Sequence, residues 1–533
     1  MIRGDLPKLQ RLGMAFSLAL TLACATEPSE SETSEDRSEK KRTILLSTEY
    51  DDLSAGEQAA REIEAEMGIY DAPELAAYIS KIGRQLVRQA APRPFQYEFY
   101  IVDQMAPNAF SLPGGHIYVS RGLIALAQDD DELANVLGHE IIHAAERHAA
   151  AQQELARRGN PFTMPFLRLA RLASYSRDHE RAADRGGQEL AARAGYDPAG
   201  MSRFLTNLGN AERLTIGYSR LSSYFDTHPG TTERVASTAT LANTLEWARN
   251  PSRRTGRANY LRHIEGVILG TNPGEGVFRE TEFIHPDMDF RILFPRGWNL
   301  INGHQAVGAI STDGSARIFI TLEAPEQAEE EPGAESEQPQ AENEHAPPRM
   351  PTPKEAAERL VANHGDEFDI RVQREQPVQL GDIQTYRLDI HGRMGTAPVI
   401  GQISFIAHEG FVLRLTSVAL SSAWPRYQGR IHTAARTFRP LTDEERNSVD
   451  VLHLGLVHAL EDESIPSLSQ RTQNTWRPGR TAVLNGVFVD SRFAAGQIVK
   501  IARSSRYQPR KPTPERISAE GDPGLVGPGP GPR

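Results

Sequence analysis

The chain has 533 residues, of which 39% are hydrophobic, enough for real cores and for about three domains. Its formal net charge of −11 argues against a nucleic-acid binder, because phosphate contacts require a basic face. Its single cysteine, Cys24, excludes an internal disulfide.

Residues 1–24 are typical of a bacterial export signal. Basic residues precede an apolar run of twelve residues, which is too short to span a bilayer as a helix. The run ends at Thr21-Leu22-Ala23-Cys24, which resembles a lipobox although threonine stands where leucine is usual. We therefore expect lipidation of Cys24, and Ala25 after it favours the outer membrane of a Gram-negative cell. A simple cleaved signal with an incidental cysteine is the alternative.

The next part of the chain changes from polar to patterned. Residues 25–45 form a Ser- and Glu-rich tether that is expected to be disordered. Residues 54–66 and 73–90 show the apolar spacing of helices. Residues 97–102 alternate like a strand, and a Pro-Gly-Gly turn precedes a second predicted strand at 117–119.

Residues 133–150 contain the pattern His139-Glu140-x-x-His143. In a helix, residues four apart lie on one face one turn from each other, so both imidazoles can reach one zinc ion. Glu140 would lie beside that ion without binding it and accept a proton from water, whose pKa zinc lowers to about 7. Apolar residues nearly all round the stretch predict a buried helix that holds its ligands rigidly, and the acidic run 129–132 suits a helix N-terminus.

A third ligand is the real test of this motif, because three fixed residues occur by chance in roughly one of every few tens of chains this long. The segment from Ser176 to Asp184 supplies it. Glu180 and Asp184 lie one helical turn apart, and alanines between them permit close helix packing. Two histidines and one glutamate leave a fourth position for water, which is typical of a catalytic zinc site.

These motifs resemble those of the HtpX/BepA-like zinc metallopeptidases, relatives of the CAAX prenyl proteases. The resemblance covers about residues 50–240, in family order, and it is carried by Asn108-Ala109-Phe110, Pro113 to Val119, Gly138 to His143 and Glu180-x-x-Ala183-Asp184. It implies a mainly α (α+β) gluzincin-type peptidase domain with one zinc ion per chain. The implied ligands are His139, His143 and Glu180, and the implied base is Glu140.

The resemblance also implies roles for residues around these ligands. Asp184 would orient a ligating imidazole, and Arg234, like Asp184, would support the ligands without binding the metal itself. Thr227-His228-Pro229 matches the family's later His-Pro pair, so His228 would stabilise the developing oxyanion. Asn108 and Ala109 would contact substrate, although Asn108 could simply cap a turn. The strand before the zinc helix would lie at the edge of the cleft, where an extended peptide pairs with it through main-chain hydrogen bonds.

Other histidines near the motif have simpler interpretations. His148 falls five residues beyond His143, about 140° away around a helix, which favours a structural role over a ligand. His116 and His179 are expected to be exposed or to cap helices.

The composition changes after residue 250, and we predict a multi-domain chain. The peptidase domain covers 46–250, and an α+β domain with an antiparallel sheet covers 255–445. Within the second domain, residues 323–353 form a Glu/Pro/Gln-rich insertion that is expected to be disordered. Residues 450–505 resemble a divergent LysM-like module, for which glycan binding and a spacer or docking role stand level. Residues 506–533 are expected to form a flexible tail.

Two functions follow from these observations. The first is an exported zinc-dependent endopeptidase of the bacterial envelope, which acts on protein or peptide substrates such as misassembled envelope proteins. The second is a chaperone or docking protein with a structural or latent zinc site, bound to outer-membrane assembly machinery or to peptidoglycan. A fourth protein ligand such as His228 or His148 would favour the second function. Both place the protein in the periplasm, held to the outer membrane by an N-terminal lipid anchor.

Overall fold

The computed structural model of the chain describes residues 49–148, 175–215, 224, 228–229, 232–249, 256–325, 349–366 and 368–510. The predictions for the signal, for Cys24, for the tether and for the tail therefore lie outside the described residues, as does most of the 323–353 insertion. The chain divides into a unit of residues 1–50 and a unit of residues 51–533. Within the described ranges, no helix combines the length and the apolar character needed to cross a membrane.

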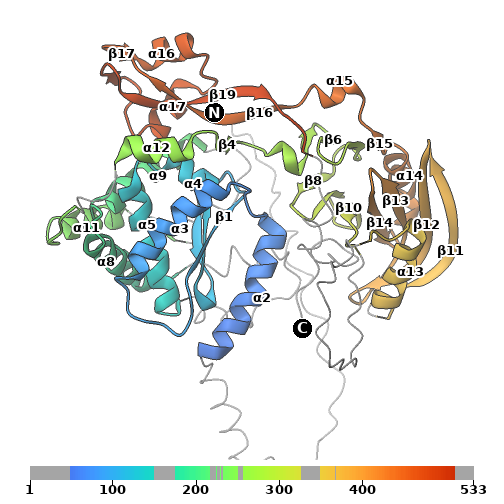
Figure 1. Ribbon diagram of the computed structural model, residues 1–533. Coiled ribbons are helices and arrows are strands. Elements are labelled where there is room, and N and C mark those ends of the chain that lie inside the picture. The colour runs from blue at the N-terminus through green and yellow to red at the C-terminus, as the bar shows by residue number, and fades with distance from the viewer. Residues whose placement is uncertain are drawn as a thin grey trace, which may run out of the picture. The chain divides into compact units, whose positions relative to one another are not determined.

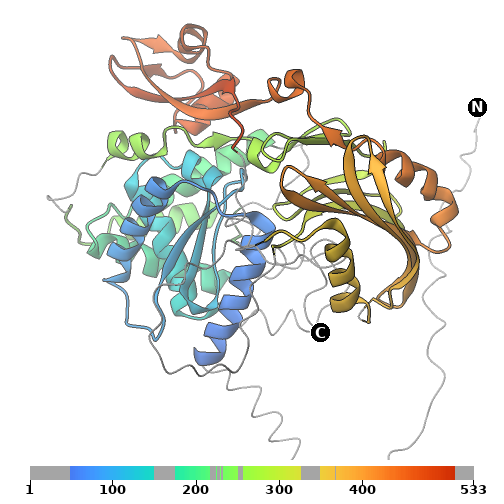
Figure 2. The same cartoon turned by 45° about the vertical axis from the view of Figure 1, so that its right-hand side comes forward.

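The first part of the fold is mainly helical and carries one small sheet (Figures 1 and 2). Both helices and both strands predicted before residue 120 are present, with bounds shifted by a few residues. In chain order the elements are α2 (Glu49–Met67), α3 (Pro73–Val87), β1 (Glu98–Val102), β2 (Ala109–Ser111), a 3-10 turn (Pro113–Gly115), β3 (His116–Ser120), α4 (Arg121–Leu126), α5 (Asp130–Ala145), α8 (Arg177–Arg193), α9 (Gly200–Thr215), α11 (Thr232–Ala242) and α12 (Arg257–Ile264).

The small sheet corrects one expectation. Its strand order is β1-β3-β2, so β3, the strand expected at the edge of the cleft, lies in the middle. It pairs in parallel with β1 and antiparallel with β2, which uses its backbone hydrogen-bonding groups on both sides. Strand β2 ends this order, and all three of its residues are buried.

Helix α5 lies at the centre of the largest hydrophobic cluster. Asp129 caps its start, because the Asp129 side chain accepts a hydrogen bond from the backbone N–H of Glu132. Every residue of α5 is buried except Ile142, which is half-buried. The prediction of a buried core helix is therefore confirmed, and the burial fixes the direction in which each side chain points.

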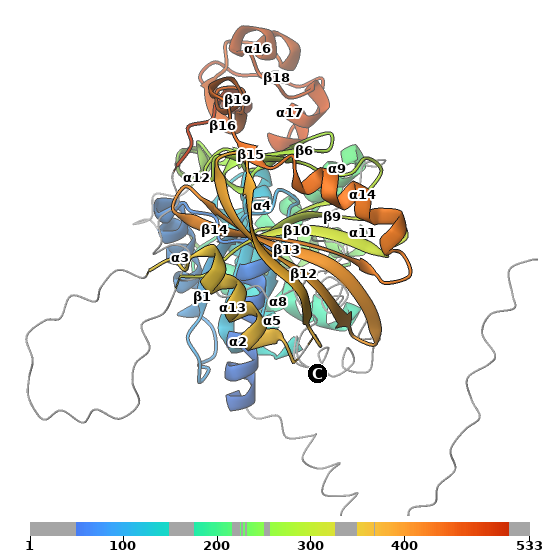
Figure 3. The same ribbon diagram turned by 90° about the vertical axis from the view of Figure 1, so that its right-hand side faces the viewer.

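The second part of the fold is an α+β arrangement of antiparallel strands. The strands are β5 (Val277–Arg279), β6 (Glu282–His285), β7 (Phe290–Leu293), β8 (Asn299–Asn302), β9 (Ala306–Ile310), β10 (Ala316–Leu322), β11 (Arg371–Leu380), β12 (Ile383–Met394), β13 (Ala397–His408), β14 (Phe411–Leu420) and β15 (Arg439–Pro440). One sheet has the order β11-β12-β13-β14-β10-β9-β8 and a smaller one the order β15-β7-β6-β5. Figure 3 labels the long strands β12, β13 and β14, and Figure 1 also labels β11. The helices are α13 (Pro353–His364), α14 (Trp424–Ala435) and α15 (Asp443–Arg446).

Alternation along β14 shows how two helices share the large sheet. Successive side chains of a strand point to opposite faces. Leu413 and Leu415 belong to the hydrophobic cluster of α14, whereas Val412 and Val418 belong to that of α13. The two helices therefore cover opposite faces of the sheet at β14, where both faces are buried.

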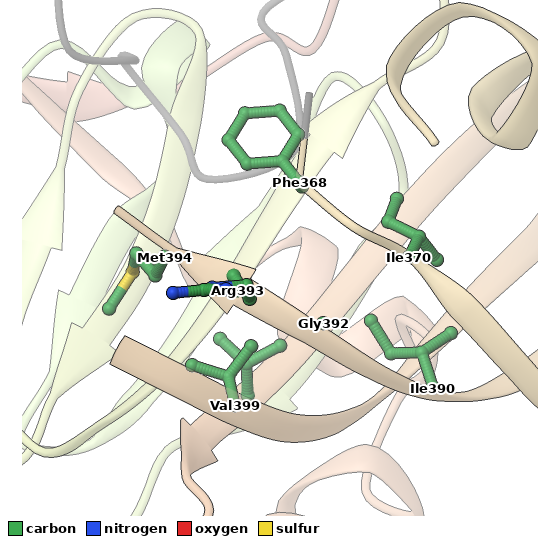
Figure 4. A pocket seen from close by; sticks show the side chains of 8 residues that line it. Phe368, Ile370, Ile390, Gly392, Arg393, Met394 and Val399 are labelled. Atoms are coloured by element: carbon green, nitrogen blue, oxygen red, sulfur yellow. The ribbon is translucent and has the colours of Figure 1, made fainter. Parts of the chain in front are cut away.

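A small apolar pocket of about 20 Å³ lies at the end of the β12–β13 hairpin (Figure 4). Its lining includes Phe368, Ile370, Met394 and Val399. A volume just above that of one water-sized sphere leaves no room for a peptide. None of its lining residues belongs to the motifs identified in the sequence.

The last part of the fold has the order β16 (Asp450–His458), β17 (Glu463–Ser464), α16 (Ile465–Thr472), α17 (Pro478–Leu484), β18 (Arg492–Phe493) and β19 (Ile498–Arg506). The first and last strands of this unit, β16 and β19, pair antiparallel, and β4 (Ile268–Leu269) pairs with the other edge of β16. Leu454, Trp476 and Ala502 of this unit belong to the same hydrophobic cluster as α5. The LysM-like identity of the unit stays a prediction.

Candidate metal centre

His139 and His143 lie on one face of α5, as their spacing predicts. Their Nε2 atoms are 2.9 Å apart, and both side chains are completely buried. Tyr175 stacks on the His143 ring with a centroid distance of 3.8 Å. The rigid helix and the packed rings leave each imidazole a single direction.

Helix α8 brings Glu180 to the same point. Ser176 caps α8, because its side chain accepts a hydrogen bond from the His179 N–H, and Glu180 lies in the first turn. Glu180 Oε1 lies 3.3 Å from His143 Nε2, and Glu180 Oε2 lies 3.6 Å from His139 Nε2. The carboxylate expected as a third ligand thus meets both imidazoles.

Two glycines, whose packing role the sequence analysis did not identify, permit this meeting. A Cβ at Gly187 would lie 2.6 Å from the backbone N of His139, and a Cβ at Gly138 would lie 2.8 Å from the Gly187 carbonyl oxygen. The backbones of α5 and α8 therefore approach closely at Gly138 and Gly187, beside the histidine pair. The signal in the sequence was Gly186-Gly187 inside a helical pattern, because glycine in a helix interior is costly unless packing needs it.

His228 joins the two helix histidines and Glu180, as the sequence analysis considered for a fourth protein ligand. Its Nδ1 lies 3.2 Å from His139 Nε2 and 3.0 Å from Glu180 Oε1, inside the donor cluster. Its Nε2 lies 3.2 Å from the Ala109 carbonyl oxygen and 3.3 Å from Glu140 Oε1. The ring is completely buried and stacks on Tyr224 at a centroid distance of 4.4 Å. His228 thus lies among the possible metal donors, and its role toward an oxyanion stays a prediction.

The donor set fits zinc. The imidazole nitrogens of His139, His143 and His228 and a carboxylate oxygen of Glu180 all lie within 4.8 Å of one another. A tetrahedral zinc ion with ligands about 2.0–2.2 Å away has donors about 3.3–3.6 Å apart, close to the separations of 2.9 to 3.6 Å found here. Three imidazoles and one carboxylate are ligands that zinc prefers.

Electrostatics around the cluster favour a charged Glu180. Burial alone would raise the pKa of Glu180, but the charge of His228 and hydrogen bonds from His143 and His228 lower it overall. Burial likewise opposes a charge on His228, but Glu180 and Glu140 raise the pKa of its imidazole. Such a concentration of negative charge and lone pairs in a dry site is balanced when a divalent cation binds.

Glu140 lies beside the donors without belonging to them. Its side chain is completely buried, and burial raises its pKa while the nearby His228 charge lowers it. The outcome is a carboxyl group whose pKa lies above its ordinary value, which suits a group that must hold a proton and release it.

Asp184 and Arg234 form the layer behind the ligands. Asp184 Oδ1 lies 3.0 Å from His139 Nδ1, on the side of the ring that faces away from the cluster. Arg234 donates from Nε and Nη2 to the two oxygens of Asp184 at 2.8 and 2.7 Å, and its Nη1 lies 2.6 Å from Glu180 Oε2. Burial would raise the pKa of Asp184, but the hydrogen bond with His139 and the Arg234 charge lower it. Arg234 thus links Glu180, an expected ligand, to Asp184, which contacts the ligand His139.

Asn108 and Ala109 lie where β2 begins. Asn108 is buried, and its backbone N–H donates to Ser120 Oγ at 2.8 Å. The Ala109 carbonyl oxygen lies next to His228 Nε2, which places the edge of β2 directly beside the donor cluster. The structure brings Ala109 to the site, whereas Asn108 contacts Ser120, and the contact of both residues with substrate stays a prediction.

The remaining histidines behave in three different ways. His116 is half-buried, 3.4 Å from Glu98. His179 stacks on His148 with a centroid distance of 4.1 Å. His148 stays outside the four-donor cluster, but its Nδ1 lies 3.0 Å from His143 Nδ1. Helix α5 ends at Ala145, so the angle expected for a continuing helix does not apply to His148.

Comparison with known proteins agrees with this geometry. Residues 73–242 match Peptidase family M48. The Beta-barrel assembly-enhancing protease of Yersinia pestis is 28% identical over 219 residues, which cover 37% of this chain and 44% of that protein. The protein of the same name from Escherichia coli (strain K12) is 27% identical over 218 residues, covering 36% and 44%. The mitochondrial metalloendopeptidase OMA1 of Arabidopsis thaliana is 34% identical over 168 residues, covering 28% and 33%. The chain thus spans less than half the length of these relatives.

Proposed function

We propose that this chain, whose residues 73–242 form a peptidase domain of family M48, is a zinc-dependent endopeptidase of the bacterial cell envelope. The observation that carries the proposal is the meeting of Glu180 with His139 and His143 from two separate helices. Substrates would be proteins or peptides, among them misassembled envelope proteins. The relatives from Yersinia pestis and Escherichia coli are both named Beta-barrel assembly-enhancing protease, and this name supports the proposed substrate class.

The residues of the site divide the chemistry among them. His139, His143 and Glu180 would hold zinc, which supplies Lewis-acid chemistry when bound. Glu140 would accept a proton from the attacking water and pass it to the leaving amine. Asp184 and Arg234 would keep the ligands in place. An extended peptide would pair with the outer edge of β2 once His228 has left the Ala109 carbonyl oxygen, and so present its own carbonyl groups to the site.

The position of His228 supports a second candidate, a latent form of the same site. Its Nδ1 lies among the donors, and a site with four protein ligands is typical of structural zinc. We propose that the described arrangement is a resting form and that His228 must leave the cluster before water can enter. Once it has left, its imidazole would be free to stabilise an oxyanion, as the resemblance implied.

Location and anchoring are proposals of the same kind. Export, acylation of Cys24 and attachment to the outer membrane rest on the first 25 residues of the sequence. Docking to assembly machinery or to peptidoglycan would fall to the units after residue 255.

Cleavage by the purified protein tests the proposed activity. Casein or an unfolded porin should be cleaved with zinc present, and a chelator should abolish the cleavage. Glu140→Gln should lower kcat by about 10²–10⁴-fold, because an amide cannot act as the base. Equal cleavage by the wild type, by the variant and by the chelated protein would remove the endopeptidase.

A second measurement separates the latent form from the open one. His228→Ala removes the fourth donor, so it should raise the exchange rate of bound zinc and leave the stoichiometry at one per chain. If zinc is lost altogether, His228 is an obligatory ligand and the resting-form proposal is wrong.

A further inference from the structure

His148 lies directly behind a zinc ligand, just past the end of α5. Helix α5 ends at Ala145, and Arg147 follows with a φ of 56°, in the left-handed region. This turn brings the chain back, so that the buried His148 ring faces His143 with their Nδ1 atoms 3.0 Å apart. On its other side, His148 Nε2 lies 3.1 Å from Glu146 Oε2.

The position of each proton along this chain follows from hydrogen-bond chemistry. His143 can bind a metal through Nε2 only with its proton on Nδ1. That Nδ1–H faces His148 Nδ1, which must then offer a lone pair. The proton of His148 therefore resides on Nε2, and this N–H donates a hydrogen bond to the Glu146 carboxylate. An ionised carboxylate has no proton to donate and can only accept.

The opposite arrangement would disable the ligand. If His148 Nδ1 carried the proton and donated to His143 Nδ1, the His143 proton would reside on Nε2 and point into the donor cluster, 2.9 Å from His139 Nε2. Glu146 disfavours this state, because it would place two acceptors, the Nε2 lone pair and the carboxylate, 3.1 Å apart.

We propose that His148 and Glu146 are positioning residues that hold His143 in the tautomer able to bind zinc through Nε2. The two histidine ligands are thus oriented by different means, His139 by the Asp184 carboxylate and His143 by a neutral imidazole with a carboxylate behind it. His179 fixes the plane of the relay, because its ring lies parallel to His148 within 11° at 4.1 Å. The inference rests on the zinc site of the proposed function.

A pair of substitutions at His148 tests the inference. His148→Leu removes the acceptor for the His143 Nδ1–H, whereas His148→Asn keeps a carbonyl oxygen near the same place. Zinc affinity is measured by competition with a chromophoric chelator, and apo-protein unfolding is followed beside it. We expect His148→Leu to weaken zinc binding by about 10–100-fold and His148→Asn to recover most of it, with apo unfolding temperatures of the two variants alike.

Glu146 supplies a second variant for the case in which His148→Leu does not fold. Its side chain is 48% exposed, so Glu146→Ala should fold and should weaken zinc binding in the same direction but by less. The matched control is Glu246→Ala, which replaces an exposed glutamate outside the site and should leave the affinity unchanged.

The outcomes separate this inference from the proposed function. A wild type that binds no zinc would remove the proposed function. A wild type that binds tightly while His148→Leu and Glu146→Ala bind equally tightly would overturn the relay alone. Equal weakening by His148→Leu and His148→Asn would also overturn it, because packing rather than hydrogen bonding would then explain the loss.

Discussion

At the scale of single residues, the site depends on hydrogen bonds behind the ligands as much as on the ligands. Arg234 has a buried side chain whose guanidinium contacts Asp184 through two hydrogen bonds and Glu180 through an ion pair. Removing one partner of such a buried pair leaves a charge without compensation, which costs more than the pair itself contributes. The layer behind the metal is therefore expected to be sensitive to small changes.

Asp184→Asn tests this layer. The neutral amide has one oxygen and no negative charge, so it cannot accept hydrogen bonds from both His139 and Arg234 as the carboxylate does. We therefore expect zinc affinity to fall by about 10–100-fold. Isothermal titration of the apo protein with zinc measures it. Asp178→Asn is the matched control, because Asp178 lies on the same helix with its side chain 89% exposed. Equal affinities for the two variants would show that Asp184 does not orient His139.

Glu132, on the zinc helix but away from the ligands, is expected to make the stability of the fold depend on pH. Burial raises its pKa to about 7. The folded state therefore keeps this proton up to about pH 7, whereas the unfolded state releases it at its usual pKa of about 4.3. Between these values the folded state binds more protons, so the free energy of unfolding contributed by Glu132 falls as the pH rises. Above pH 7 this contribution no longer changes.

Urea unfolding at several pH values measures this slope. Glu132→Gln should flatten the dependence between pH 4.5 and 7, since an amide does not titrate. Glu57→Gln, at an exposed position of α2, should show the same slope of unfolding free energy against pH as the wild type. A slope that stays the same in Glu132→Gln would assign the pH dependence to other groups.

At the scale of elements, the crossing of α5 and α8 determines whether a site exists. Each helix supplies only part of the donor set, and the two backbones touch at Gly138 and Gly187. Because the two glycines have no side chains, the helix backbones can come close enough for Glu180 on α8 to reach both histidines on α5. The crossing is rigid because both helices are buried along this face.

Gly187→Ala tests the crossing. Its Cβ would lie 2.6 Å from the His139 backbone N, so the helices must separate, and we expect a loss of about 1–3 kcal/mol in stability together with weaker zinc binding. Gly209→Ala is the control, because nothing lies within 4 Å of that Cβ on α9 and alanine favours helix by about 1 kcal/mol. Thermal unfolding and zinc titration of both variants provide the comparison, and similar losses in the two would contradict the role of the crossing.

At the scale of the whole molecule, the last unit of the chain is joined to the element that precedes the zinc helix. Lys500 on β19 is completely buried, and its Nζ donates to the carbonyl oxygens of Ala125 and Ala127 at 2.8 and 3.0 Å. These carbonyls end α4, and α5 begins three residues later. Burial lowers the pKa of Lys500 well below its ordinary value. A unit that shares a core cluster and this contact is expected to unfold together with the peptidase region.

Lys500→Met keeps the length of the side chain and removes its donors. Buried carbonyls then lose a partner, so we expect a destabilisation of about 1–3 kcal/mol in one cooperative transition. Arg503→Met, on the same strand but exposed, should stay near the wild type. Two separate calorimetric transitions in the wild type would show instead that the last unit folds independently.

The sequence by itself determined the parts whose signal is local. The spacing His139-Glu140-x-x-His143 places two ligands on one helix face because helix geometry repeats every 3.6 residues, and the apolar residues around them predicted its burial. The helices and strands before residue 120 were predictable for the same reason. The α+β character of residues 277–440 followed from runs of alternating and periodic residues.

Tertiary structure alone decided what depends on contacts between distant segments. Pairing on both sides put β3 in the middle of its sheet and left the edge to β2, which no local pattern encodes. The approach of Gly138 to Gly187, the entry of His228 into the donor cluster and the turn that sets His148 against His143 each join segments whose distance in space the sequence does not state. Side chains on one helix keep fixed relations because the backbone enforces them, whereas relations between elements depend on how whole surfaces pack.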